Sequence, residues 1–145
     1  LIRDLITQGR LKLKRPMEHA VAYHDSCYLG RHNGIFDAPR HILSSLPGVR
    51  VRELERNREQ GFCCGAGGGM VWFEERIGKR VNVERTEEAL RLGPAMVATA
   101  CPFCIQMFED GIKAKGMEEK LKVKDIAELV AESVEGDGAA QKASV

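Results

Sequence analysis

The stretch Met96-Val97-Ala98-Thr99-Ala100-Cys101-Pro102-Phe103-Cys104 joins an apolar segment directly to a C-x-x-C motif. Residues 96–100 are uniformly small or apolar, as a strand covered on both faces should be. Proline is well placed in the first turn of a helix, so Pro102 favours a helix that begins right after Cys101. The stretch therefore predicts a buried strand whose end carries cysteine and leads into a helix.

The same order of strand, cysteine and helix recurs upstream. Residues 21–24 are a short candidate for a buried strand, and Cys27 follows almost at once. Asp37 then opens an amphipathic pattern that Pro47-Gly48 stops, which predicts a helix between these points. Residues 49–54 alternate apolar with charged side chains, which predicts a second strand nearer the edge of the sheet.

Two more helices are predicted from the rest of the chain. Apolar side chains recur at three- and four-residue intervals from Met70 onward, which predicts helix over residues 70–92 with a kink at Gly78. Val123 closes a fourth short strand. Asp125 and Glu128 then form a capping-box-like helix start.

The predicted order is strand–helix repeated about four times. This order predicts an α/β fold with a small, mainly parallel sheet of about four strands, right-handed crossovers and helices on both faces. Each cysteine group follows the carboxyl end of a strand, and in open α/β sheets sites are built at that edge. We therefore expect loops that are far apart in sequence to bring their cysteines together there.

Length and composition fit a single globular domain. The chain has 145 residues, 43% hydrophobic and 30% charged, and a formal charge of +1 that gives no sign of a nucleic-acid surface. No apolar stretch approaches the roughly 18–20 residues that cross a bilayer, and no signal peptide is visible. An odd number of cysteines argues against a disulfide framework and for a reducing, cytoplasmic location.

The sequence also predicts how the chain is divided. Residues 1–15 are expected to be the end of an upstream helix or a linker, and residues 16–134 to form the domain itself. Residues 135–145 are rich in glycine, alanine and polar residues, which predicts a disordered tail. Because the first residue is Leu1 rather than methionine, we expect the chain to be a piece of a longer polypeptide.

Five cysteines are the candidate ligands of one inorganic centre: Cys27, Cys63, Cys64, Cys101 and Cys104. Two alternatives to a metal centre are buried structural cysteines and a thioredoxin-like C-x-x-C redox pair. The redox pair would leave the other three cysteines without a role. A structural zinc ion takes four ligands, and adjacent cysteines chelate one ion awkwardly. Neighbouring cysteines more naturally hold different metal atoms of a cluster, so the pattern favours an iron–sulfur site over zinc.

The glycine run after the cysteine pair has two explanations. It could cradle a phosphate at a helix N-terminus, but it lacks the G-x-G-x-x-G pattern and the G-K-[ST] ending. Alternatively, glycines such as Gly65 and Gly67 let backbone N–H groups approach cluster sulfurs closely. Trp72 either covers the following helix or shields the cluster from water.

Charged and polar residues near the cysteines have weaker assignments. His24, Asp25 and His32 could transfer protons or ligate metal, but loop residues that hydrogen-bond to backbone are the commoner case. Arg31 and Arg40 could offset the charge of a cluster or bind an anionic substrate, although exposed arginines are the ordinary outcome. No catalytic residue is assigned.

Three segments together, residues 24–31, 62–68 and 100–104, resemble the cysteine-rich CCG domain. That domain is found in one of the subunits of heterodisulfide reductase and in iron–sulfur subunits of glycolate, lactate and glycerol-3-phosphate oxidoreductases. The resemblance covers roughly residues 20–132. It implies that the five cysteines bind a [4Fe–4S] cluster, which is non-cubane in heterodisulfide reductases, while some relatives carry zinc in one copy of the domain.

The resemblance also implies partners. The sequence around the cysteines most resembles the C-terminal CCG copy in iron–sulfur oxidoreductases that accept electrons from electron-transfer flavoprotein. Those proteins carry a membrane anchor, a ferredoxin-type cluster segment and a first CCG copy. We therefore expect an electron-transfer module of a larger flavin- or quinone-linked oxidoreductase, held at the cytoplasmic face of a membrane only through other parts. The alternatives are a zinc- or cluster-stabilised docking domain and a thiol–disulfide redox module.

Overall fold

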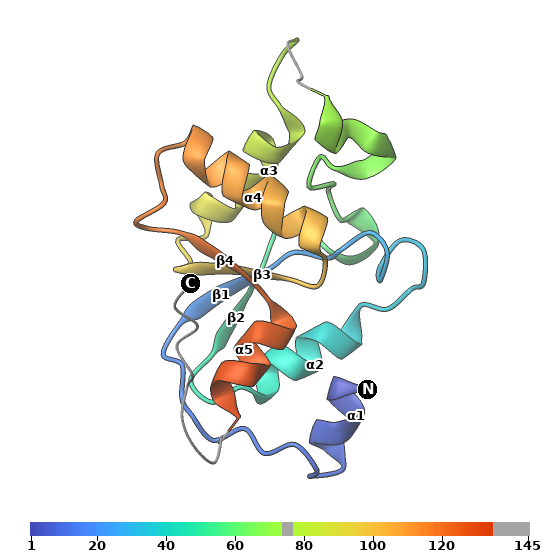
Figure 1. Ribbon diagram of the computed structural model, residues 1–145, viewed down its shortest axis with the longest axis vertical. Coiled ribbons are helices and arrows are strands. Elements are labelled where there is room, and N and C mark those ends of the chain that lie inside the picture. The colour runs from blue at the N-terminus through green and yellow to red at the C-terminus, as the bar shows by residue number, and fades with distance from the viewer. Residues whose placement is uncertain (74–76, 135–145) are drawn as a thin grey trace, which may run out of the picture.

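The computed structural model describes residues 1–73 and 77–134 (Figure 1). Four short strands alternate with helices along the described chain, and two 3-10 turns, η1 and η2, lie between the second strand and the third helix. The elements in chain order are α1 Ile2–Thr7, β1 Ala20–Tyr23, α2 Asp37–Ser45, β2 Arg50–Glu53, η1 Arg58–Gln60, η2 Gly67–Trp72, α3 Val81–Arg91, β3 Met96–Thr99, α4 Pro102–Ala114, β4 Lys122–Asp125 and α5 Ile126–Ser133.

The sheet is entirely parallel and has the strand order β2-β1-β3-β4. Val21 in β1 pairs with Val51 in β2 on one side and with Met96 in β3 on the other. The chain therefore moves outward from β1 to β2 and then returns past β1 to β3. This reversal places a topological switch point between β1 and β3, the position where open α/β sheets build their sites. The predicted α/β fold is confirmed.

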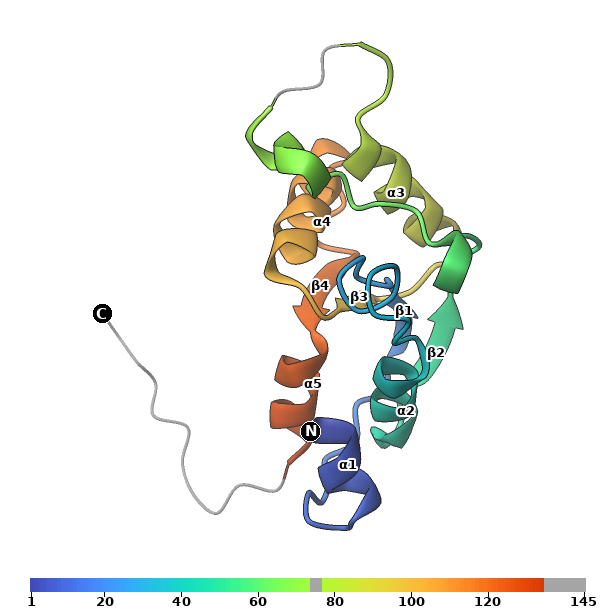
Figure 2. The same ribbon diagram turned by 90° about the vertical axis from the view of Figure 1, so that its right-hand side faces the viewer.

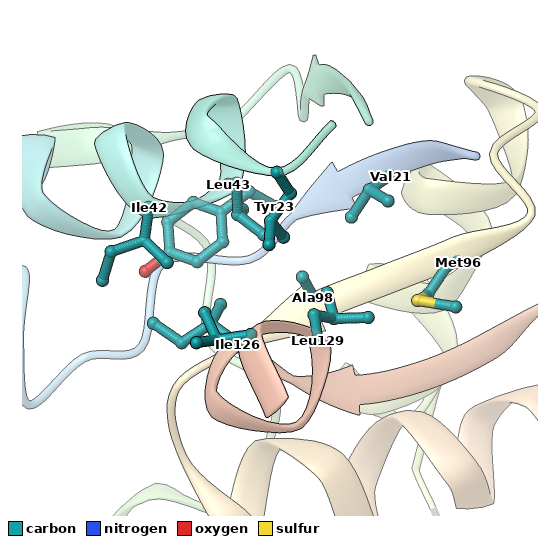
Figure 3. Close-up of a cluster of buried hydrophobic side chains, with 10 residues drawn as sticks. Val21, Tyr23, Ile42, Leu43, Met96, Ala98, Ile126 and Leu129 are labelled. Atoms are coloured by element: carbon teal, nitrogen blue, oxygen red, sulfur yellow. The ribbon is translucent and has the colours of Figure 1, made fainter. Parts of the chain in front are cut away.

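Helices cover both faces of the sheet (Figures 1 and 2). Alternate residues of β1 point to opposite faces, because side chains of a strand have a period of two. Val21 and Tyr23 pack with α2 and α5, and Figure 3 shows Tyr23 close to Ile42 and Ile126. Ala22 packs instead into a second cluster formed mainly by α3 and α4, with Val97 and Phe108. The core is thus split into two layers by the sheet.

Burial of the strands follows their position in the sheet. All four residues of the central strand β3 are buried, as the apolar stretch predicts. The edge strand β2 buries none of its residues fully, in agreement with its alternating charged sequence. Asp125 and Glu128 form the predicted capping box at the start of α5. No helix of the described residues combines the length and the apolar character that crossing a bilayer requires.

One predicted helix is wrong in extent. The segment over residues 70–92 does not form a single helix, because α3 begins only at Val81 and η2 ends at Trp72. Gly78 has a positive φ of 73°, which is a left-handed conformation that ends helix rather than kinking it. Residues 74–76 of the predicted helix lie outside the described residues, as does the tail predicted over residues 135–145.

Candidate metal centre

All five cysteines line one cavity at the carboxyl edge of the sheet. Cys27 lies in the loop after β1, the Cys63–Cys64 pair in the connection after β2, and Cys101 and Cys104 at the junction of β3 with α4. These segments lie side by side on the right of Figure 1, the side that faces the viewer in Figure 2. The cavity measures about 290 Å³, whereas one water needs only roughly 10–15 Å³. It has room for a group far larger than a single ion.

The sulfur atoms run from the interior to the mouth of the cavity. Cys64 and Cys104 are buried and pack against Met107, while Cys27, Cys63 and Cys101 are partly exposed. Cys101 is the N-cap of α4 and Pro102 occupies its first turn, so the C-x-x-C motif opens a helix as predicted. The two cysteines of that motif therefore reach the cavity from the positive end of a helix.

The glycine run brings backbone N–H groups to the thiol of Cys63. The Gly65 N–H donates to Cys63 Sγ at 3.3 Å. Gly65 has a φ of 102°, and a Cβ there would lie 3.0 Å from Met107 Cε and 3.2 Å from the Asn82 nitrogen. A Cβ at Gly67 would lie 3.7 Å from Cys63 Sγ. Larger residues at Gly65 would therefore strain the loop that carries the cysteine pair.

The thiols of the pair are held in their protonated form when no metal is bound. Contact with the Cys64 thiol and burial raise the pKa of Cys63, against the lowering effect of the Gly65 and Gly67 N–H groups. Hydrogen bonding with Cys104 raises the pKa of Cys64 to about 12. Because metals bind thiolates, a cation entering this cavity must displace protons from these sulfurs.

His24 lies beside the two buried sulfurs. Its ligand nitrogen and the Cys64 and Cys104 sulfurs all lie within 4.8 Å of one another. Arg85, which is fully buried in α3, donates from Nε to His24 Nδ1 at 3.1 Å. Burial, followed by the charge of Arg85, lowers the pKa of His24 to about 3, so the imidazole is neutral at physiological pH. The commoner case of a loop histidine bonded to backbone does not describe His24, because its Nδ1 accepts from a side chain.

Asp25 and Arg40 form a buried ion pair under the Cys27 loop. Arg40 donates to both oxygens of Asp25, at 2.7 and 2.9 Å, and to both oxygens of Glu53 on β2. Burial acts to raise the pKa of Asp25, but bonds from Arg40 and from the Arg58 N–H outweigh it and lower the pKa. Arg40 is 8% exposed, so its expected place in solvent is wrong, and it acts as an anchor between strand and helix.

The cavity offers further hydrogen-bond donors. Ser26 Oγ is buried at its wall and has no partner among the described residues. Arg31 and Arg58 also line the cavity, and the Arg31 guanidinium donates to the Gly61 carbonyl at 2.8 Å. Arg58 is the sole non-glycine residue of the described chain with a positive φ, 52°. Cysteine sulfurs surrounded by such donors suit an anionic metal–sulfur group, which hydrogen bonds to sulfur would stabilise.

The remaining predicted residues lie at the rim or outside it. Trp72 lines the cavity while 82% of it is exposed, so it borders the opening rather than covering a helix. His32 is exposed and does not line the cavity.

Arg85 and Glu88 support the site but were not predicted from the sequence. Their spacing with Asn82 and Ala89 could have indicated them, because it places all four residues on one face of the helix. Charged residues on a buried helix face must be paired with other polar groups.

The chain is similar in sequence to a known protein family and to several curated proteins. The family model described as "Cysteine-rich domain", CCG, matches residues 21–109. The chain is 48% identical over 136 residues to "Probable iron-sulfur-binding oxidoreductase FadF" of Bacillus subtilis, covering 94% of this chain and 19% of that protein. It is 44% identical over 142 residues to "EtfAB:quinone oxidoreductase" of Syntrophomonas wolfei, covering 93% and 20%.

A third relative belongs to an archaeal enzyme. The chain is 39% identical over 133 residues to one of the subunits of "Dihydromethanophenazine:CoB--CoM heterodisulfide reductase" of Methanosarcina barkeri, covering 92% of this chain and 32% of that protein. The chain thus spans about a fifth to a third of the length of these relatives. No solved structure matches the chain. The family model covers more than half of the chain, and the chain belongs to the CCG family of cysteine-rich domains.

Proposed function

We propose that this chain is the electron-transfer module of an iron–sulfur oxidoreductase and that Cys27, Cys63, Cys64, Cys101 and Cys104 hold its [4Fe–4S] cluster. The observation that carries the proposal is the convergence of all five cysteines on one cavity at the switch point of the sheet. The names of the relatives, which include an iron–sulfur-binding oxidoreductase and part of a heterodisulfide reductase, support it.

The number and placement of the thiols favour a cluster over one metal ion. A tetrahedral zinc site needs four ligands, and this cavity presents five cysteines with space for a larger group. A cubane cluster likewise takes four cysteines. The fifth sulfur therefore favours a non-cubane [4Fe–4S] cluster, which Cys63 and Cys64 would hold together with the other three cysteines.

The chain's own groups would assist such a cluster in defined ways. The Gly65 N–H, which already donates to Cys63 Sγ, would stabilise negative charge on that sulfur, and Ser26 Oγ would gain the partner that it lacks. Arg31 and Arg58 bring positive charge to the mouth. When bound, the cluster would accept and release single electrons, while the sheet and α4 hold the cysteines in place.

The partners of the module are proposed from its relatives. One relative is named as an oxidoreductase that links EtfAB to quinone. We therefore propose that the module works inside a larger redox complex. From the family resemblance we further propose that a second CCG copy and a ferredoxin-type cluster domain lie next to it. Electrons would come from a flavoprotein such as electron-transfer flavoprotein, on the cytoplasmic side of a membrane.

A zinc-stabilised docking domain is the second candidate, because the His24, Cys64 and Cys104 donor atoms all lie within 4.8 Å of one another and are of the kinds that bind zinc. Anaerobic purification of the complete polypeptide, followed by iron, zinc and acid-labile sulfide analysis, separates the two. We expect iron and sulfide in equal amounts, and the loss of one cluster's share of both from a variant in which all five cysteines are replaced by serine. One zinc per chain that the same replacements remove would overturn the proposal.

A further inference from the structure

A buried network of polar contacts leads from α3 to His24, which lies beside the sulfur atoms. Glu88 Oε2 lies 2.8 Å from Arg85 Nη1, and Arg85 Nε donates to His24 Nδ1 at 3.1 Å. Glu88, Arg85 and His24 are each at most 2% exposed. A ring nitrogen of His24 lies within 4.8 Å of the sulfurs of Cys64 and Cys104. The network therefore ends at His24, whose ring lies next to the two deepest sulfurs of the site.

His24 could take part in the site as a metal ligand or as a hydrogen-bond donor. A histidine that ligates a metal offers an unprotonated nitrogen and usually donates its other N–H to a carboxylate or a carbonyl. The partner of His24 Nδ1 is a guanidinium, which has donors and no acceptor. Nδ1 must therefore be unprotonated, and a neutral ring then carries its proton on Nε2.

Metal ligation through Nε2 needs the opposite tautomer, with Nε2 unprotonated and the proton on Nδ1. Ligation there would move the proton to Nδ1, where it would face the Nε–H of Arg85. Arg85 itself cannot turn away easily, because its Nη1 contacts Glu88 and donates to the Arg56 carbonyl at 3.0 Å. The ring is also held on its other side, since Phe108 packs edge-on with ring centroids 5.1 Å apart. His24 is thus fixed in orientation and in tautomer.

We propose that Arg85 holds His24 as the Nε2–H tautomer and that this N–H donates to the sulfur of Cys64 or Cys104, so that His24 sets the reduction potential of the bound cluster without coordinating it. The inference rests on the proposed function, because it concerns a cluster that the cysteines hold. A hydrogen bond to sulfur stabilises the more negative, reduced state and raises the potential. Arg85 is a positioning residue in this scheme, because it acts on the sulfurs only through His24.

The unaltered protein gives the first test. The complete polypeptide is labelled with ¹⁵N-histidine, and pulsed EPR measures the nitrogen coupling to the paramagnetic cluster. We expect a weak coupling, transmitted through a hydrogen bond, that disappears in His24→Gln. A strong coupling of a directly bonded nitrogen, lost in the same variant, would make His24 a ligand and overturn the proposal. No coupling at all would also overturn it, since the N–H would then be remote from the sulfurs.

Redox titration followed by EPR gives the second test. His24→Leu removes the N–H, and Arg85→Met removes the group that fixes the tautomer. We expect both to keep the wild-type iron and sulfide content and to lower the midpoint potential of this cluster. His24→Gln should lower it less, because the amide can donate in place of the ring. The control is His32→Ala, which alters an exposed histidine outside the cavity and should leave the potential unchanged.

The two proposals fail in different ways. Iron and sulfide contents that are the same in the wild-type protein and in the variant with all five cysteines replaced by serine would refute the cluster itself and with it the proposed function. A wild-type protein with its cluster, but with the same potential in His24→Leu and Arg85→Met, would refute only the role of His24. Loss of iron from folded His24→Leu would likewise refute it, because a hydrogen-bond donor is not needed to retain the metal.

Discussion

Cys63 and Cys64 are neighbours in the sequence but face different surroundings. Cys64 is buried against Cys104 and Met107, whereas Cys63 is partly exposed and receives the Gly65 N–H. If the two sulfurs bind different iron atoms, neither can replace the other. Each thiol should therefore be needed separately for an intact cluster.

We expect Cys63→Ser and Cys64→Ser each to remove or alter the EPR signal of the cluster and to lower the iron content. Serine keeps the size of the side chain but replaces the soft sulfur ligand with a hydroxyl. EPR spectra and iron analysis after anaerobic purification measure both effects. His32→Ala is the control and should retain its cluster. An unchanged spectrum in both serine variants would exclude the pair as ligands.

Arg40 gives a second prediction for a single residue, this time for stability. Arg40→Met leaves the Asp25 carboxylate buried without its main partner, and removing one member of a buried ion pair costs about 3–5 kcal/mol. Denaturant unfolding should show a loss of this size. Arg50→Met, on the exposed face of the same edge strand that carries Glu53, should change stability by less than about 0.5 kcal/mol. Equal stability of the two variants would contradict the anchoring role.

Helices α3 and α4 pack against each other and cover one face of the sheet. The two helices cross at Gly111, where a Cβ would collide with Thr86 Oγ1 and lie 3.0 Å from the Asn82 carbonyl. We expect Gly111→Ala to destabilise the fold by about 1–3 kcal/mol, the range for an overpacked core. Lys113→Ala on the exposed face of α4 should be nearly neutral. An unfolding midpoint equal to that of the wild type in Gly111→Ala would show that the helices can move apart freely.

The buried Glu88 carboxylate in α3 should make the stability of the fold depend on pH. Burial acts to raise the pKa of Glu88, but the Arg56 N–H and the Arg85 charge outweigh it, so the pKa of the folded protein lies below the ordinary value of 4.5. The ionised carboxylate therefore stabilises the fold fully above pH 4.5, and this contribution is lost as the pH falls through the lower, folded pKa. Glu88→Gln should be less stable than the wild type at pH 7, and the gap should narrow at pH 3. A gap that stays constant with pH would refute the pairing.

The elements also show where sequence reasoning succeeds and where it stops. Strands and most helices were predictable, because β3 is uniformly apolar, β2 alternates, and Asp125 signals the start of α5. The single helix predicted over residues 70–92 does not form, since apolar spacing carries no information about the left-handed backbone at Gly78. A periodic pattern cannot distinguish a buried helix face from apolar side chains at the rim of a cavity.

At the scale of the whole molecule, parallel topology made the meeting of the cysteines predictable. Strands that run the same way end at the same edge, so their following loops meet whatever their separation in sequence. The polar support behind the sulfurs was not predictable. His24 and Arg85 are 61 residues apart, and nothing in either local sequence indicates that they pair. The strand order that brings α3 over β1 decides this contact.

The central claim is that sulfurs from three separate loops share one iron–sulfur group. Anomalous X-ray scattering at the iron absorption edge, from crystals of the complete polypeptide grown without oxygen, tests it most directly. We predict several iron peaks inside the cavity bounded by Cys27, Cys63, Cys64, Cys101 and Cys104, each within bonding distance of a sulfur. A cavity with a single zinc peak, or iron peaks that leave Cys27 or the cysteine pair without contact, would contradict the account.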